Sequence, residues 1–327
     1  MKKIFSVLLA LSLVLAMASG AFAMEDTDTV AVGAVVLVKD GVSEDVVYDF
    51  VSTIFENLDA VSEAHAKGLE LSLEAASSVT AVPYHPGAAK YFAEKGIEVA
   101  AVKEGAADGS VSAKKYFFGT GGEAGTYYAF GSVLAQFITN NSGTSVTAVV
   151  GRGSKANVED LTSEDAPIQF AFCQSDVMSY AYEGTSLFEE KLDGFSVVAS
   201  LYLEQVQIVT LDPSIKTVAD LKGKLVSIGD IGSGVNFNAF DCLAAYDLTI
   251  DDLKEPVYQG FGDSAESLKN GKIDAFFCVA GAPTTAITEL ATGGKEVYLV
   301  GFDADHIAAL IEMSPYYTAV TLPAGTY

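Results

Sequence analysis

Two glycine-rich turns constrain the fold of this chain more than any other feature. Residues 119–128 follow an apolar run from Tyr116 to Phe118, and residues 229–236 follow a run from Leu225 to Ile228. Each turn opens a helical pattern, so each predicts a strand that leads directly into a helix. The first N–H groups of such a helix lack internal partners and carry the positive end of its dipole, and glycine lets a ligand approach them closely. Two such turns facing one cleft would hold a small anionic solute between them.

The remaining sequence alternates between apolar runs of strand length and helical patterns. Val30 to Lys39 predicts a buried strand, and helices follow from Ser43 to Leu58 and from His85 to Lys95. The stretch 103–112 has small and polar residues without periodicity, which predicts a flexible linker. The later strand candidates are 116–118, 146–150, 168–172, 195–203, 206–211, 225–228, 273–279 and 297–300, with helices between them near 126–139, 156–161 and 177–182. Such alternation predicts an α/β fold of two lobes, with ligands outside the carboxyl ends of the strands.

The N-terminus predicts export. Residues 1–3 are positively charged, Ile4 to Met17 is an apolar stretch too short for a membrane span, and residues 21–23 have the small-x-small pattern of a cleavage site. A retained anchor helix is the alternative, which Ser19 and Gly20 disfavour because they interrupt the apolar stretch. Cleavage near Ala23 would leave a periplasmic or extracellular protein that begins near residue 24 and is long enough for two domains.

The charge of the chain bears on its partners. The formal net charge is −24, and loss of Lys2 and Lys3 with the signal peptide would take it to −26. Such a field repels nucleic acid, so no nucleic-acid partner is expected. An anionic ligand must then be attracted by local dipoles and a few placed cations.

The reactive side chains form no catalytic or metal-binding pattern. Cys173, Cys242 and Cys278 stand in apolar segments and are expected to be buried thiols, although one disulfide is open. The three histidines lie far apart without metal-ligand spacing, and no Gly-x-Ser-x-Gly segment occurs. We therefore expect no catalytic residue, cofactor or metal, and we do not expect an enzyme.

Candidate ligand contacts in the first lobe begin at the first turn. Gly121, Gly122 and Thr126 offer free amides for a carboxylate, and the Tyr127 ring can cover an aliphatic part of the ligand. The alternative is a tight turn that serves only packing.

Three further elements of this half carry candidates. Ser154 and Asn157 begin a helix and can donate to a ligand, with Arg152 or Lys155 as a possible ion-pair partner, although Ser154 also reads as a plain helix cap. Gln174 and Asp176 end a strand, where Asp176 either receives an ammonium group or caps the next helix. Tyr202, with Glu204 nearby, either walls the cleft or belongs to the core.

The second lobe supplies the other anion-type turn. Its candidate contacts are Gly232, Ser233, Gly234, Val235 and Asn238, of which Ser233 is the strongest single candidate. Pro283 is expected to shape the wall of this lobe.

The motifs in this sequence resemble a known family. In order, they are 116–134, 151–157, 172–176, 201–207, 220–224, 229–236 and 271–275 with 280–283. The series is similar to the solute-binding proteins of TRAP transporters of the TAXI family. The resemblance implies a type II periplasmic binding protein fold, with two lobes of parallel-rich mixed sheets flanked by helices and a hinge between them. It also implies capture of a small carboxylate-bearing solute, such as glutamate or a related amino or keto acid, for delivery to integral-membrane subunits.

The order of segments departs from that family. There, a strand like Val30 to Val38 and the helices after it lie at the carboxyl end, directly behind a segment like 315–327. The chain therefore resembles a circular permutant whose old ends are joined near 103–112. Residues 24–38 would return to the hinge, with lobe one at 39–203 and lobe two at 204–327; an unrelated extra domain is the alternative.

Other functions remain open from the sequence. Gly119-x-Gly121-x-x-Ala124 approaches the dinucleotide fingerprint and Arg152 would suit a 2′-phosphate, so a secreted NADP-binding oxidoreductase is the alternative. A sensor subunit that binds the same solute would have the same sequence features.

Overall fold

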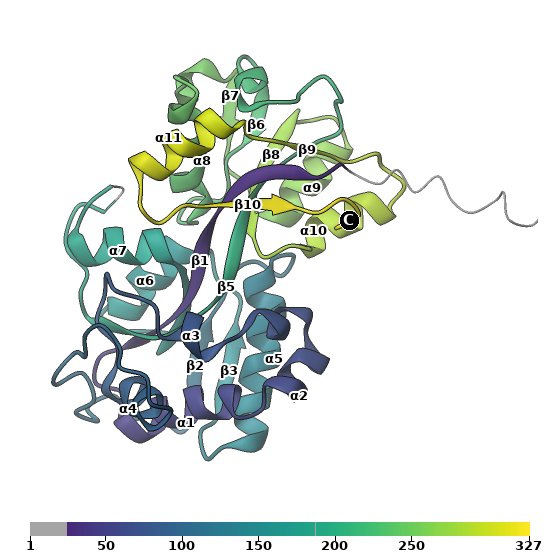
Figure 1. The fold of residues 1–327 in the computed structure, drawn as a ribbon. Helices are drawn as coiled ribbons and strands as arrows, with labels where there is room; N and C mark the ends of the chain where they lie inside the picture. Colours follow the sequence, from purple (N-terminus) through teal and green to yellow (C-terminus); the bar gives the residue numbers. More distant parts are fainter. Residues whose placement is uncertain (1–24, 187) are drawn as a thin grey trace, which may run out of the picture.

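The structure is a computed structural model that describes residues 25–186 and 188–327, drawn in Figure 1. The predicted signal peptide lies outside the described residues. Within the described part, no helix is both long enough and apolar enough to cross a membrane.

One mixed sheet runs through both lobes. Its strands follow the order β3-β2-β4-β1-β5-β8-β6-β7, with β10 beside β1 and β9 beside β5. The outer strands pair in parallel, whereas β1 and β5 are antiparallel to their neighbours. The strands are β1 Thr27–Lys39, β2 Tyr116–Gly119, β3 Val146–Val149, β4 Phe170–Gln174, β5 Phe195–Thr210, β6 Leu225–Ser227, β7 Glu255–Val257, β8 Ala275–Ala280, β9 Tyr298–Val300 and β10 Thr318–Leu322. The α/β fold class and the two-lobe architecture predicted from the sequence are confirmed.

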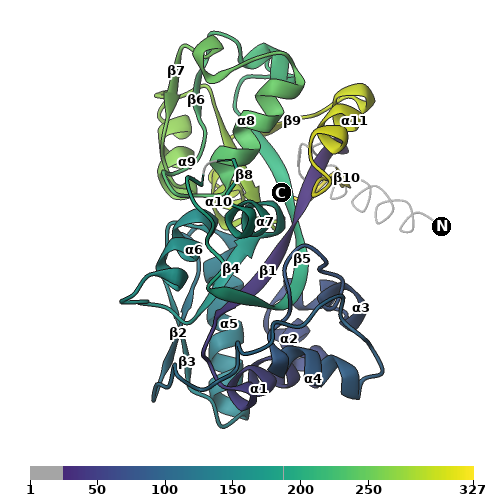
Figure 2. The same cartoon turned by 90° about the vertical axis from the view of Figure 1, so that its left-hand side faces the viewer.

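Helices cover the sheet in both lobes (Figures 1 and 2). The first half carries α1 Glu44–Phe55, α2 Leu58–Ala64, α3 Leu73–Ala76, α4 Pro86–Glu94, α5 Thr126–Asn141, α6 Ser154–Thr162 and α7 Ser175–Glu183. The second half carries α8 Val235–Ala245, α9 Phe261–Lys269, α10 Thr285–Thr292 and α11 Ala304–Met313. Short 3-10 turns, including Ala66–Glu70, connect some of these elements.

Two long strands, β1 and β5, run from one lobe into the other (Figure 1). They pair antiparallel from Ala31 opposite Gln205 to Lys39 opposite Phe195. The first half of β1 packs with the second lobe through Val30 and Val32, and its second half belongs to the core of the first lobe. The lobes are therefore joined through the middle of one sheet.

Strand β5 corrects one sequence prediction. Glu204 and Gln205 interrupt the apolar run, so the sequence predicts two strands, 195–203 and 206–211. The structure has one continuous strand, because its backbone bonds to β1 as far as Gln205 and to β8 from Gln205 onward. Backbone hydrogen bonds to β1 and β8 keep the strand continuous although Glu204 and Gln205 are polar.

The first long helix also ends earlier than the periodicity predicts. Helix α1 stops at Phe55, and Leu58 begins the separate helix α2. Ser43 stands at the N-cap of α1, but its side chain makes no capping hydrogen bond. Leu58 packs against the same core as α1, so the apolar spacing continues past the end of the helix.

The stretch 103–112, predicted to be a flexible linker, is held in place along its length. Gly41 N donates to Ala106 O at 2.6 Å, and Val111 N donates to Gly41 O at 2.9 Å. The Lys103 ammonium pairs with Asp40 at 2.6 Å, and Ala106 is buried. The segment is therefore ordered by contacts with distant residues, although its sequence lacks the periodic apolar pattern of a helix or strand.

The three cysteines are buried and unpaired. Burial holds the pKa of each thiol well above its ordinary value. The expectation of buried thiols therefore describes them, and the disulfide left open by the sequence does not form among them.

Candidate functional site

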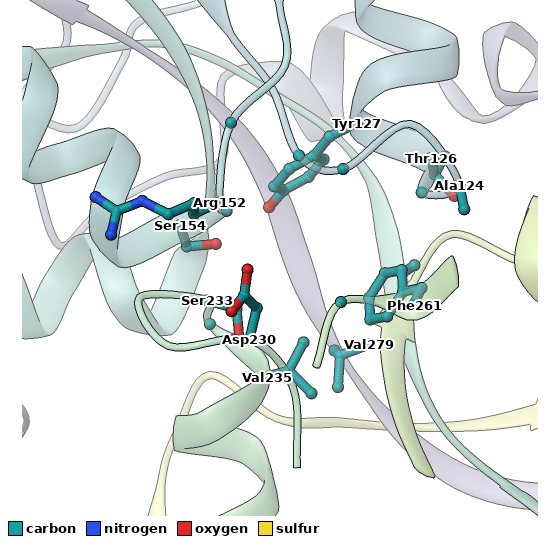
Figure 3. A pocket seen from close by; sticks show the side chains of 18 of the residues that line it. Ala124, Thr126, Tyr127, Arg152, Ser154, Asp230, Ser233, Val235, Phe261 and Val279 are labelled. Carbon is teal, nitrogen blue, oxygen red and sulfur yellow. The ribbon is translucent and has the colours of Figure 1, made fainter. Parts of the chain in front are cut away.

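A cavity of about 570 Å³ lies between the two lobes. Figure 3 shows Tyr127 and Ser154 of the first lobe pointing into it, with the apolar side chains Val235, Val279 and Phe261 on the side of the second lobe. The cavity combines polar groups on some walls with aliphatic and aromatic side chains on others, as small-molecule sites usually do.

Four helices with glycine N-caps begin at this cavity, two from each lobe. Their N-cap residues are Gly125 for α5, Gly153 for α6, Gly234 for α8 and Gly260 for α9, and all four glycines line the cavity. Serine, threonine, asparagine or aspartate at an N-cap would accept a hydrogen bond from the first-turn amides. Glycine has no side chain to do so, and the first-turn amides are therefore available to a ligand, except that of Ala156 in α6, which donates to Gly232 O. The positive ends of four helix dipoles therefore lie around one cavity.

Lobe contacts close the cavity at several points. Thr126 Oγ1 donates to Gly281 O at 2.7 Å, Ala156 N donates to Gly232 O at 2.9 Å, and Ala286 N donates to Ala124 O at 3.2 Å. Each bond joins the first half of the chain to the second. The described conformation is therefore a closed one, in which a solute would be enclosed by both lobes.

Charged groups at the cavity are unevenly distributed. Arg152 is the one cationic side chain among the described residues that line it, and it is exposed. Glu123, Asp230 and Asp263 also line it. Because acids outnumber cations, attraction of an anion must come mainly from the helix N-termini.

A buried carboxyl group lies at the sheet side of the cavity. Glu204 projects from β5, is 2% exposed, and accepts a 2.7 Å hydrogen bond at Oε2 from Tyr127 Oη. Burial raises the pKa of Glu204 to about 8, because desolvation disfavours the charged form more than the Tyr127 bond stabilises it. The carboxyl is therefore largely neutral at pH 7.

The profile of one protein family matches residues 16–96 and 118–327, described as the NMT1-like family. The chain belongs to the NMT1-like family.

Three of the solved structures to which this chain is similar are described as binding proteins for small solutes. The alkanesulfonate-binding protein of Xanthomonas axonopodis pv. citri is 18% identical, with 58% of this chain and 61% of that chain covered and a TM-score of 0.39. The periplasmic aliphatic sulphonate-binding protein of Escherichia coli is 19% identical, with 58% and 57% covered and a TM-score of 0.35. An ancestral arginine-binding protein is 16% identical, with 62% and 93% covered and a TM-score of 0.37. The chain spans less than two thirds of the two sulfonate-binding proteins.

Most of the predicted contacts in this NMT1-like protein meet at the cavity. The structure places nine of them in its lining: Gly121, Gly122, Thr126, Tyr127, Ser154, Gln174, Ser233, Gly234 and Val235. Ser233 is 8% exposed, and its Oγ has no hydrogen-bond partner among the described residues.

The other six predicted contacts do not line the cavity: Asn157, Asp176, Tyr202, Gly232, Asn238 and Pro283. Asn157 is buried and donates to Thr120 O and Phe172 O, so it supports the two loops beside it. Gly232 accepts the lobe-to-lobe bond from Ala156, and Tyr202 packs on Phe130 and Phe172. Asn157 and Tyr202 are buried behind the cavity wall and support it, whereas Pro283 is exposed.

A polar network behind the wall joins the lobes. Asn238 of α8 donates to Asp176 Oδ2 of α7 and to Tyr317 Oη, both at 2.9 Å, and accepts from Gln174 Nε2 at 2.9 Å. Burial raises the pKa of Asp176 to about 7 despite the bond from Asn238. Asp176 lies in the first turn of α7 and does not line the cavity, so direct contact with a ligand ammonium does not fit its position.

The glycine-capped start of α9 is not among the predicted contacts. Gly260, Phe261 and Gly262 line the cavity at the N-terminus of α9. The strand before them, Glu255–Val257, has three residues and includes Pro256, so it gives no strand pattern. The two closely spaced glycines were the available signal.

No group of three histidine, cysteine, aspartate or glutamate residues in the described part of the chain could hold a metal ion.

Proposed function

We propose that this chain is an extracytoplasmic solute receptor that encloses a small carboxylate-bearing solute, such as glutamate or a related amino or keto acid, between its lobes. The main support for this proposal is the set of four glycine-capped helix N-termini around one cavity of about 570 Å³. Each N-terminus has the effect of about half a positive charge, so together they offset an anionic group without a buried cation.

The buried Ser233 hydroxyl supports a ligand that forms a hydrogen bond at this wall. Ser233 lines the cavity beside the N-cap of α8, is 8% exposed, and its Oγ lacks a partner among the described residues. A buried hydroxyl without a hydrogen bond is costly, by about 1–3 kcal/mol in protein mutational data. A carboxylate oxygen between Ser233 and the α8 amides would accept from both.

The proposed membrane partner is a transporter of the TRAP type. The motif series from 116–134 to 280–283 supports a TAXI-family receptor, and the family profile spans most of the same residues. The predicted signal peptide supports a location outside the cytoplasm. Binding and release by lobe motion about β1 and β5 require no catalysis, cofactor or metal.

Circular permutation is part of the proposal. The family profile matches in two blocks, 16–96 and 118–327, and the residues between them include the 103–112 joint. The two ends of the described part also lie together: Thr27 pairs with Leu322, and Ala324 N donates to Asp26 Oδ1 at 2.7 Å. In a chain with the segment order of the TAXI family, a short hairpin could connect β10 to β1. In the present chain, lobe one would span 39–203 and lobe two 204–327.

The direct test is a thermal-shift screen of residues 24–327 with amino acids, keto acids and dicarboxylates. Each acid is paired with its primary amide or alcohol, which keeps the carbon skeleton and removes the charge. A receptor should be stabilised by an acid and not by its uncharged analogue, by about 2.7 kcal/mol at a hundred times the dissociation constant. Equal stabilisation by acid and analogue would contradict the anion site.

A further inference from the structure

Of the four acidic side chains that line the cavity in the described chain, only that of Glu204 is buried. Tyr127 Oη donates to its Oε2 at 2.7 Å. The second oxygen, Oε1, forms no hydrogen bond with a described residue and retains accessible surface at the cavity. Oε1 is therefore the atom of Glu204 that a solute can reach.

The bond from Tyr127 fixes where a proton on Glu204 would be. A phenol has one proton, and Tyr127 uses it in the bond to Oε2. Because Oε2 is then an acceptor, the proton of a neutral Glu204 is on Oε1. The neutral side chain thus presents an O–H donor to the cavity, whereas the ionised side chain would present an acceptor.

The groups around Glu204 favour its neutral form. Burial is the main cause that raises its pKa to about 8, and the nearby Asp176 of α7 raises it further. Lys67 acts in the opposite direction, but its ammonium pairs with Glu70 and forms no ion pair with Glu204 in the described chain. The other ionisable neighbours are uncharged, because burial raises the pKa of each: Tyr127, Tyr202, Cys173 and Cys278.

We infer that Glu204 binds the solute in its protonated form and donates a hydrogen bond from Oε1 to a carboxylate or keto oxygen of the solute. The inference rests on the proposed function. An ionised Glu204 would place a second negative charge beside an anionic solute at a buried site and would repel it. The neutral acid adds a donor to the amides of the helix N-termini. The solute is therefore an acid that directs an unprotonated oxygen, and not an ammonium group, toward β5.

Binding should then be linked to proton uptake. At pH 8, about half of the Glu204 side chains in the free protein are ionised. A bound anion disfavours the carboxylate, so each ionised side chain takes a proton from the solvent onto Oε1, or about 0.5 proton per bound solute. An ammonium group at the same place would stabilise the carboxylate and release protons. The sign of the proton exchange distinguishes the two contacts.

Isothermal titration calorimetry on residues 24–327 at pH 8 measures this exchange, in phosphate and in Tris, whose ionisation enthalpies differ. The probes are 2-oxoglutarate, glutarate, pyruvate and 2-oxoisocaproate, none of which titrates near this pH, with glutamate, alanine and leucine as amino counterparts. The acid that binds should take up about 0.5 proton, and its affinity should fall at least about tenfold between pH 7 and pH 9.5.

Two kinds of failure are separable. Proton release, an affinity that is constant over this range, or binding of the amino acids alone would overturn the inference and leave the receptor function intact. Binding of none of these acids would overturn both.

Variants assign the effect to Glu204. Glu204→Gln keeps an acceptor for Tyr127 and an NH₂ donor for the cavity, but it does not titrate. Its affinity for the same acid should therefore change by less than about threefold between pH 7 and pH 9.5, without proton uptake at pH 8. Glu204→Met removes the donor and should weaken binding at pH 7 at least about tenfold.

Asp176→Asn is the matched control, because Asp176 titrates in an overlapping range without lining the cavity. This variant should retain the fall in affinity at high pH. If Glu204→Met does not fold, the pH profiles of the wild type and Glu204→Gln still decide. A Glu204→Gln variant that keeps the pH dependence would overturn the assignment to Glu204.

Discussion

Tyr127 Oη donates a 2.7 Å hydrogen bond to Glu204 Oε2, joining the first turn of α5 to the long strand β5. The Tyr127 ring stacks on Phe172 with centroids 4.6 Å apart, so the tyrosine is held from two sides. The bond places an uncharged carboxylic acid at the sheet side of the cavity.

The Glu204 carboxyl should make stability depend on pH. Its pKa is about 8 in the folded chain against an ordinary value of 4.5, so the folded state retains a proton that the unfolded state releases. The resulting stabilisation is complete below pH 4.5 and is lost as the pH rises to about 8. Across that window the free energy of unfolding should fall by up to about 1.4 kcal/mol per pH unit for this group. Glu204→Gln keeps an acceptor for Tyr127 and should flatten the slope measured by urea unfolding at pH 5, 6.5 and 8.

Asp176 titrates in an overlapping window, so Glu204→Gln alone should leave a residual slope. Its pKa rises from 3.8 to about 7 on folding, mainly through burial. The double variant with Asp176→Asn should show a smaller slope than either single variant, whereas the exposed Glu123→Gln serves as a control. A slope unaffected by both substitutions would show that these carboxyls ionise freely in the folded chain.

The role of the glycine N-caps in ligand binding can be tested at Gly260, which has the most room for a side chain among the four. A Cβ there meets no atom within 4 Å, and φ is −65°. Gly260→Asp would cap the α9 amides with its own carboxylate and should weaken carboxylate binding at least about tenfold, or by about 1.4 kcal/mol. The matched Gly260→Ala variant should bind within about threefold of wild type. Calorimetry measures both, and equal affinity of the aspartate variant would mean that α9 does not contact the solute.

The closed conformation should depend on Thr126. Its hydroxyl donates to Gly281 O at 2.7 Å across the lobes and is buried. Thr126→Val keeps the shape, removes the donor and leaves Gly281 O without this partner, which should weaken binding by about 1–2 kcal/mol. Thr126→Ser retains the hydroxyl and should bind nearly as wild type. Small-angle scattering with the solute present should show a larger fraction of open molecules for the valine variant only.

Asn238 should stabilise the lobes against each other. Three hydrogen bonds meet at its side chain, and all four participating residues are buried. Asn238→Ala leaves Gln174, Asp176 and Tyr317 with lost partners and should lower the free energy of unfolding by about 2–4 kcal/mol. Asn270→Ala, which removes an exposed local bond to Glu266, should change it by less than about 0.5 kcal/mol. Denaturant unfolding of both variants gives the comparison.

Reordering the chain tests the permutation. A chain that begins at residue 113, continues from Tyr327 into Glu25 and ends near residue 102 should fold and bind the same solute. The bonds between β10 and β1 and from Ala324 to Asp26 place the two ends for such a connection. An unfolded product, beside a folded parent chain, would show that the present order is required.

Local patterns were enough for most of the elements that border the cavity. The runs before Gly119 and Gly229 are strands and the patterns after them are helices, because periodicity and glycine act over a few residues. The third helix start, at Ser154, follows from the same local logic. Gly260 escaped prediction because a three-residue strand has too little sequence to show a period.

Other features depend on contacts that no local pattern contains. Glu204 and Gln205 break an apolar run, yet partners from two different strands keep β5 continuous through them. Asn157, Asn238 and Asp176 have the residue types of ligand contacts, but their distances from the cavity follow from how α6, α7 and α8 pack. Residue type alone does not distinguish a ligand contact from the support behind it.

The sequence by itself determined the alternating strands and helices, the glycine-rich helix starts and the predicted export signal, since each depends on neighbours along the chain. The tertiary structure decided which helix starts share one cavity, why Asn238 lies behind its wall and why Glu204 keeps its proton. Those properties arise from desolvation and from hydrogen bonds between residues separated by up to 79 positions in the chain, and only the folded lobes bring them together.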